Sequence, residues 1–251
     1  MAVNTELVVA GVIVGVALLL AWRTRRGAAG ARPTLRPLPA YDELTTLAAR
    51  ALEAGRVVVV SVGRAALGRQ ATPTSVSALT VLRRAALDGC ATGTPPAVTV
   101  GEATLLPAAQ DELRWAFQAV GRAAHFSLAQ VEFVAAGQDG LAYAAGVSQT
   151  LPREAAASCV VVGRYGPELV LITEAAARAQ AELIVGVDEP AALAVAAAAS
   201  SQPLLAEEML AAGAYLDGRP SQIASLQTQD VLRWLVALGL MGLALFQLAQ
   251  G

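Results

Sequence analysis

Two apolar segments lie at opposite ends of the chain, separated by a long stretch of mixed polarity. The first runs from Leu7 to Trp22 and the second from Val231 to Ala249. A helix that spans the hydrocarbon core of a bilayer needs about 20 mostly apolar residues, so the pattern predicts a transmembrane helix at each end. The expected organisation is a transmembrane helix within 1–22, a basic linker rich in Pro and Ala over 23–40, an α/β domain over 41–222, and a second transmembrane helix with a short lead-in within 223–251.

Each terminal segment has an alternative interpretation. A cleaved signal peptide needs basic residues before its apolar run, whereas here Glu6 precedes the run and the basic residues follow it. The position of the basic residues therefore favours an uncleaved first anchor. For the second segment, the alternative is a buried helix of the domain core. Trp22 and Trp234 lie at the inner ends of the two segments, where anchors of the membrane interface are expected.

The flanks of the first segment predict an orientation. Positively charged flanks stay on the cytoplasmic side of a membrane. We therefore expect the α/β domain in the cytoplasm and both termini outside, in a two-pass arrangement. The residues that carry this prediction are Arg23, Arg25, Arg26, Arg32 and Arg36.

Both segments also carry small residues at a spacing that lets helices approach closely in lipid. Gly11 and Gly15 lie on the first segment, and Gly239 and Gly242 lie on the second. We interpret them as helix-packing positions. The sequence leaves open whether the two helices pair within one chain or between subunits. The expected partners are the lipid bilayer and either other membrane proteins or further copies of this chain.

Between the anchors, short runs of β-branched residues alternate with longer helical segments. Continuous apolar runs are typical of strands that are buried on both faces of a sheet. Strands that alternate with helices favour parallel βαβ units. We therefore predict a Rossmann-like α/β fold, with an open, mostly parallel sheet and helices on both faces.

The predicted strands lie within 56–63, 97–101, 131–135, 159–163 and 183–187. The predicted helices cover 41–54, 75–88, 107–125, 141–151, 168–180 and 207–216. The alanine-rich stretch 191–199 favours a helix, with a strand as the alternative.

Composition excludes several classes of function. All 18 basic residues are arginine and the formal charge is −2, so the basic linker is interpreted as a topology signal rather than a nucleic-acid surface. Cys90, Cys159 and the single histidine, His125, lack the spacing of metal ligands. We expect no metal, no cofactor and no nucleic-acid partner.

The sequence also shows no catalytic constellation. Cys159 opens an apolar strand, where a cysteine is usually a small buried hydrophobic residue. Glu207 and Glu208 begin a predicted helix, where acidic residues are favoured by the helix dipole alone.

Candidate ligand contacts follow the predicted strands. In open parallel sheets, ligands bind outside the carboxyl ends of the strands. Glycine there lets the backbone approach a ligand, and an adjacent charged residue can bind it. The candidate positions are Gly63, Arg64, Gly101, Glu102, Gly163, Arg164 and Asp188.

One of these loops has the glycine spacing of a phosphate-binding loop, at Gly63 and Gly68. That motif needs Lys to reach the terminal phosphates and Ser or Thr to hold magnesium. Arg69 and Gln70 occupy those positions here. The sequence therefore argues against nucleotide binding by that motif.

Three apolar stretches, LLPAAQDELRWAFQAVGR at 105–122, VVVGRYGPELVLITEAA at 160–176 and EEMLAAGAYLDG at 207–218, resemble a bacterial membrane-protein family. This family is known only as a domain of unknown function and occurs mainly in green non-sulfur bacteria. The resemblance implies membrane attachment and an α/β soluble part. It implies no activity and no site residues. We expect the protein in the bacterial inner (cytoplasmic) membrane.

The leading hypothesis from the sequence is a non-catalytic scaffold or regulatory module, held at the membrane by two anchors that raise its local concentration against membrane partners. The alternative is a small-ligand sensor that uses the carboxyl edge of the sheet. A membrane-tethered enzyme, whose polar residues converge only in three dimensions, is the third hypothesis.

Overall fold

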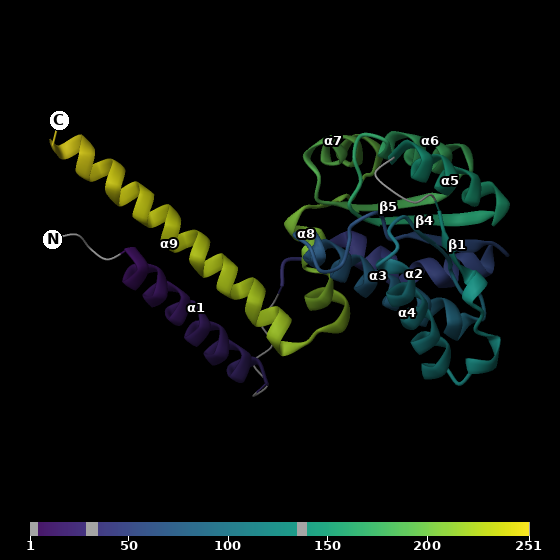
Figure 1. Cartoon of the computed structure of the whole chain (residues 1–251), viewed down its shortest axis with the longest axis horizontal. Coiled ribbons are helices and arrows are strands. Elements are labelled where there is room, and N and C mark those ends of the chain that lie inside the picture. Colours follow the sequence, from purple (N-terminus) through teal and green to yellow (C-terminus); the bar gives the residue numbers. More distant parts are fainter. Residues whose placement is uncertain (1–4, 29–34, 135–139, 251) are drawn as a thin grey trace. The chain divides into compact units, whose positions relative to one another are not determined.

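The computed structural model describes residues 5–28, 35–134 and 140–250, with some side chains near the two termini left out. The chain divides into two compact units. One comprises residues 1–36 and 213–251, and the other comprises 37–212. Each unit is described by itself (Figure 1).

The larger unit is built on a parallel sheet. Within the described residues, six strands lie in the order β3-β2-β1-β4-β5-β6, and every neighbouring pair is parallel. The strands are β1 (Val57–Ser61), β2 (Ala97–Val100), β3 (Val131–Phe133), β4 (Ala156–Gly163), β5 (Glu182–Val187) and β6 (Leu204–Leu205). The five predicted strands are confirmed, while the two-residue β6 was not predicted. The strand order reverses between β1 and β4.

Helices cover both faces of this sheet, which explains why its strands are so apolar (Figure 1). On one face lie α2 (Pro39–Glu53), α3 (Thr72–Thr92) and α4 (Leu105–Ala119). On the other lie α5 (Gly140–Arg153), α6 (Leu169–Arg178) and α7 (Pro190–Ala199). The alanine-rich stretch is thus a helix, and the predicted α/β fold with a parallel sheet is confirmed.

Two predicted helices end early. The helix expected over 107–125 ends at Ala119, because Gly121 takes a left-handed φ of 72°, which glycine adopts readily at a helix end. A short 3₁₀ turn then covers Ala123–His125.

The helix expected over 207–216 is also shorter. It forms only α8 (Glu207–Leu210), and a π-helical turn, η3, follows over Gly213–Asp217. Gly213 is a poor helix former and lies against the side chain of Gln222.

A buried hydrogen-bond network ties the centre of the sheet to the helices of one face. The Tyr165 hydroxyl lies 2.9 Å from the carbonyl oxygen and 2.8 Å from Oγ of Ser61. The same Oγ lies 2.7 Å from the Tyr143 hydroxyl, which donates to the carbonyl oxygen of Thr99 at 3.3 Å. Burial raises the pKa of both tyrosines, so they stay protonated and the network does not respond to ordinary changes of pH.

The smaller unit pairs α1 (Thr5–Ala28) with α9 (Pro220–Gln250). The two helices run side by side in opposite directions, with the N-terminus of α1 and the C-terminus of α9 at the same end (Figure 1). The terminal segments therefore pair within one chain. Among the described side chains, no helix combines the length and the apolarity that a membrane span needs.

A Cβ built at Gly15 meets no atom of the described residues within 4 Å, so the structure shows no close approach of α9 at this position. The surroundings of Gly11, Gly239 and Gly242 lie outside the described residues. At the other end of the unit, the Tyr215 hydroxyl donates to the carbonyl oxygen of Arg36 at 2.7 Å.

Replacing Tyr165 with Phe should lower the free energy of unfolding by about 1–3 kcal/mol, since Ser61 loses a buried hydrogen-bond partner. Urea unfolding measures the difference. Tyr215→Phe removes an exposed hydrogen bond and is the control, with a smaller expected loss. Equal losses in free energy of unfolding in the two variants would show that the buried network stabilises the fold no more than an exposed hydrogen bond does.

Candidate functional site

The loops after β1 and β4 meet at the carboxyl edge of the sheet. Gly63 has a φ of 74°, and a Cβ there would lie 2.9 Å from the backbone nitrogen of Arg164. Gly163 has a φ of 141°, and its Cβ would lie 2.5 Å from the carbonyl oxygen of Val62. The backbone N–H of Arg64 donates to the carbonyl oxygen of Arg164 at 3.3 Å. Only glycine allows this approach at both positions, so the two arginines begin side by side.

Arg64 extends from β1 to the start of α6. Its Nη2 lies 2.5 Å from Oε1 of Glu168, and only 18% and 7% of the two side chains are exposed. On the way it passes Gly101, where a Cβ would lie 2.6 Å from Cγ of Arg64. Glycine at the end of β2 therefore leaves room for this side chain.

The backbone N–H of Gly166 donates to the same Oε1 of Glu168 at 2.8 Å. Burial opposes ionisation of Glu168, but the hydrogen bonds from Gly166 and Arg64 outweigh it. The pKa of this carboxyl therefore lies below its ordinary value. Glu168 is ionised at neutral pH and holds Arg64 in place.

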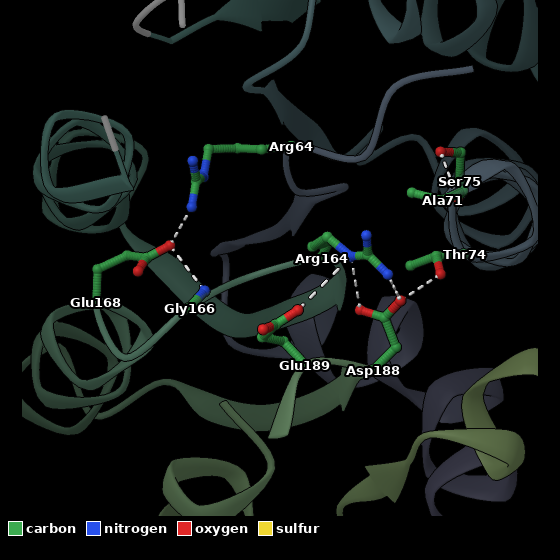
Figure 2. A network of polar contacts seen from close by, with 9 residues as sticks. All are labelled: Arg64, Ala71, Thr74, Ser75, Arg164, Gly166, Glu168, Asp188 and Glu189. Atoms are coloured by element: carbon green, nitrogen blue, oxygen red, sulfur yellow. Dashed lines mark hydrogen bonds and ion pairs between the residues drawn. The ribbon is translucent and has the colours of Figure 1, made fainter. Parts of the chain in front are cut away.

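Arg164 makes the second ion pair of this edge (Figure 2). Its Nη2 lies 2.7 Å from Oδ2 of Asp188, and its Nε lies 3.4 Å from Oδ1. The Thr74 hydroxyl donates to Oδ2 of Asp188 at 2.6 Å, which links the end of β5 to the first turn of α3. The hydrogen bond with Asp188 raises the pKa of Arg164, so this guanidinium is permanently charged. Glu189 lies at 4.0 Å from its Nε.

A cavity of about 330 Å³ opens beside these pairs. All of its charged lining residues are arginines, and no carboxylate lines it. One lining residue, Ala65, is held in place because the buried Ser75 hydroxyl donates to its carbonyl oxygen at 2.8 Å. The lining consists of Arg64, Ala65, Ala66, Arg69, Gln70, Ala71 and Arg164. The chemistry offered is that of an anion-binding site.

The structure brings most of the predicted contacts together. Gly63 and Gly163 shape the two loops and Gly101 makes room for Arg64, while Asp188 acts as a support for Arg164. Glu102 does not join them. Its Oε1 lies 3.5 Å from the backbone nitrogen of Thr104, and the residue does not line the cavity.

Sequence reasoning missed three residues of this edge. Glu168 and Thr74 lie inside predicted helices or next to them, where polar residues are ordinarily solvated, so no local signal marked them. Arg69 was considered only as an unsuitable replacement for the lysine of a phosphate-binding loop. Three arginines in the loops after β1 and β4 were the signal that could have identified the cavity.

A second cavity, of about 480 Å³, lies at the opposite edge of the sheet. Its charged lining residues are Glu132, Arg153 and Glu154. Arg153 forms ion pairs with both carboxylates, so its charge is already satisfied there. This cavity therefore offers no unpaired cation to a ligand, and its lining carries one more carboxylate than arginine.

The two cysteines and the single histidine have surroundings that do not suit catalysis. Burial raises the pKa of the Cys159 thiol to about 12 and that of Cys90 to about 11, so neither is a nucleophile at neutral pH. His125 is exposed at the end of its 3₁₀ turn. In the described part of the chain, no three His, Cys, Asp or Glu side chains gather as metal ligands would.

Comparison with known proteins places the chain in a family. Residues 2–250 match the family described as Domain of unknown function (DUF6754). No curated protein shows a significant match. No solved structure shows one either. The family match confirms the resemblance to a family of unknown function, while membrane attachment stays a prediction.

Replacing Glu168 with Gln should lower the free energy of unfolding at pH 7 by roughly 3 kcal/mol, because Arg64 is left with a neutral partner in a mostly buried place. A carboxyl with a lowered pKa stabilises the fold above its unfolded pKa, and this contribution is lost as pH falls through the folded value. The difference between the two proteins should therefore shrink below about pH 4.

Urea unfolding between pH 3 and pH 7 measures this difference. The matched control is Glu174→Gln on α6, whose ion pair with Arg178 is exposed. It should change stability by less than about 1 kcal/mol. A pH-independent difference for Glu168→Gln would show that the charge of Glu168 does not matter.

Proposed function

The chain belongs to the DUF6754 family, and because that family is described only as a domain of unknown function, we propose a function from the chain's own residues. The protein is a membrane-anchored sensor that binds a small anionic ligand at the carboxyl edge of its sheet. The observation that carries this proposal is the cavity lined by Arg64, Arg69 and Arg164.

The position of the cavity supports ligand binding. In open α/β sheets, ligands bind where the strand order reverses, outside the carboxyl ends of the two strands at that point. Here the order reverses between β1 and β4, and the cavity lies between the loops that follow these strands. The general rule and the arginines therefore indicate the same place.

The lining favours binding over catalysis. It consists of arginine, alanine and glutamine. None of these residue types is among those that ordinarily serve as general acids or bases. A non-catalytic module, as the sequence predicted, agrees with this lining. A scaffold role is supported less, since the cavity offers a ligand site with a defined charge.

The membrane anchor in this proposal is the pair α1 and α9. A helix of 24 residues, such as α1, is about 36 Å long, compared with about 30 Å for the hydrocarbon core of a bilayer. Large apolar side chains on both helices are exposed, among them Leu18, Trp234 and Leu240. The proposal rests mainly on the apolar sequence of the two segments, including residues whose side chains the structure does not describe.

Ligand binding is tested by native mass spectrometry of the full chain purified in mild detergent. We expect a small anionic molecule to stay bound to the wild type and to be lost from Arg164→Gln, since this arginine lines the cavity. The control is Arg114→Gln, which removes an exposed arginine of α4 outside the cavity. A ligand-free wild type that gains no thermal stability from any phosphorylated, carboxylated or sulfated metabolite would contradict the proposal. A stoichiometric partner protein in the same preparation would favour the scaffold.

The anchor is tested by fractionation of cells that express the full chain. We expect the protein in the membrane fraction, resistant to extraction with alkaline carbonate, because two apolar helices span the bilayer. A reporter that is active only in the cytoplasm should be inactive when it is fused after Gly251. Release of the protein by carbonate would contradict the anchor, and an active reporter would contradict the orientation.

A further inference from the structure

We propose that the group recognised in this cavity is a phosphate, bound between Arg69 and Arg164 in front of α3. This inference rests on the proposed function and adds the chemical class of the ligand. The candidate class is a small phosphorylated metabolite whose phosphate end enters the cavity.

The charges around the cavity favour a phosphate. Arg64 and Arg164 are each held by a carboxylate that lies outside the lining, Glu168 and Asp188. Arg69 differs, because in the part of the chain that the structure describes no acidic side chain lies within ion-pair distance of it. Arg69 is an exposed residue of the cavity lining, so it supplies a positive charge that no described acidic side chain neutralises.

The number of hydrogen-bond donors at the cavity also favours a phosphate. Asp188 accepts from Nε and Nη2 of Arg164, which leaves the Nη1 amino group for a ligand (Figure 2). Arg69, which also lines the cavity, adds a second guanidinium. One guanidinium fork satisfies both oxygens of a carboxylate. Donors from two arginines instead suit a phosphate, which offers three terminal oxygens and up to two negative charges.

The start of α3 adds less to this preference than the arginines do. Ala71 lines the cavity and immediately precedes α3, a helix of 21 residues. Ala71 provides no side-chain cap, and the first turn contains no acidic residue. The Thr72 N–H already donates to the carbonyl oxygen of Arg69, Pro73 has no N–H, and the carboxylate of Asp188 accepts from the Thr74 hydroxyl in the same turn. The helix end therefore adds only its partial positive charge, and the arginines are the hydrogen-bond donors to the anion.

The size and the residue types limit the ligand further. A volume of about 330 Å³ is at the low end for small-molecule sites, so a small metabolite fits better than a dinucleotide. Alanines 65, 66 and 71 form the remaining walls and do not obstruct the guanidinium groups. Gln70 stands where a phosphate-binding loop has its magnesium-holding hydroxyl, which favours binding of the phosphate without its transfer.

The test uses pyrophosphate as the probe, titrated calorimetrically into the full chain in detergent at constant ionic strength. We expect saturable binding to the wild type and no comparable binding of acetate. Arg69→Gln and Arg164→Gln should each weaken pyrophosphate binding by roughly tenfold or more, the cost of losing hydrogen bonds between charged groups. Arg69→Lys should recover part of the loss because it restores the charge without the planar fork.

Two further variants sharpen the result. Glu189→Gln should strengthen binding of pyrophosphate, because it removes a carboxylate that lies 4.0 Å from Nε of Arg164 and competes with the ligand. Arg178→Gln, which alters an exposed arginine of α6, should leave binding unchanged. Thermal unfolding without ligand shows whether each variant is folded, and Arg69→Gln should be as stable as the wild type because Arg69 makes no ion pair in the described structure.

The outcomes separate this inference from the proposed function. Pyrophosphate binding that is unaffected by Arg69→Gln and Arg164→Gln would overturn the phosphate site. If a co-purified anion depends on Arg164 but pyrophosphate neither binds nor displaces it, the phosphate is wrong while the sensor proposal stands. If the wild type binds neither pyrophosphate nor any small anion, both are wrong.

Discussion

The backbones that follow β1 and β4 approach each other so closely that side chains cannot fit between them. Gly63 and Gly163 provide this approach, and the positive φ of each is one that other residues rarely adopt. Because the two loops share this contact, Arg64 and Arg164 leave the sheet side by side and then diverge to different carboxylates. The arrangement of the whole edge follows from these two glycines.

The carboxylates turn this backbone constraint into a fixed electrostatic site. Glu168 holds Arg64 from the start of α6, and Asp188 holds Arg164 from the end of β5. Fixed guanidinium groups lose little freedom when an anion binds, which favours recognition of small ligands. The deep network of Ser61, Tyr143 and Tyr165 lies directly beneath and keeps the ends of the strands in register.

The sequence predicted the framework of this site better than its details. Continuous β-branched runs such as Val57–Val60 are typical of strands that are buried on both faces of a sheet. The strands and their carboxyl ends could therefore be predicted from these runs. Glycine followed by arginine, at Gly63 and Gly163, marked the loops correctly. Pairings across the fold could not be predicted, because nothing near Glu168 in the sequence indicates Arg64.

Local rules also failed where tertiary contacts decide the outcome. β6 has only two residues, Leu204 and Leu205, and exists because β5 offers a free edge for pairing. The predicted helix over 207–216 does not continue through Gly213. The side chain of Gln222 packs against this glycine, a contact that the local sequence pattern does not indicate. Arg69 does not fit the lysine position of a phosphate-binding loop, but an arginine can bind an anion without that motif.

The most direct test of the account is to observe the arginine side chains themselves while an anion is added. All basic residues of the chain are arginines, so the Nε–H groups of the full chain, labelled with ¹⁵N and assigned with single variants, report on every cation. Pyrophosphate should shift the signals of Arg69 and Arg164 and leave those of Arg114 and Arg178 in place. Uniform shifts, or none, would contradict a specific anion site at the carboxyl edge of the sheet.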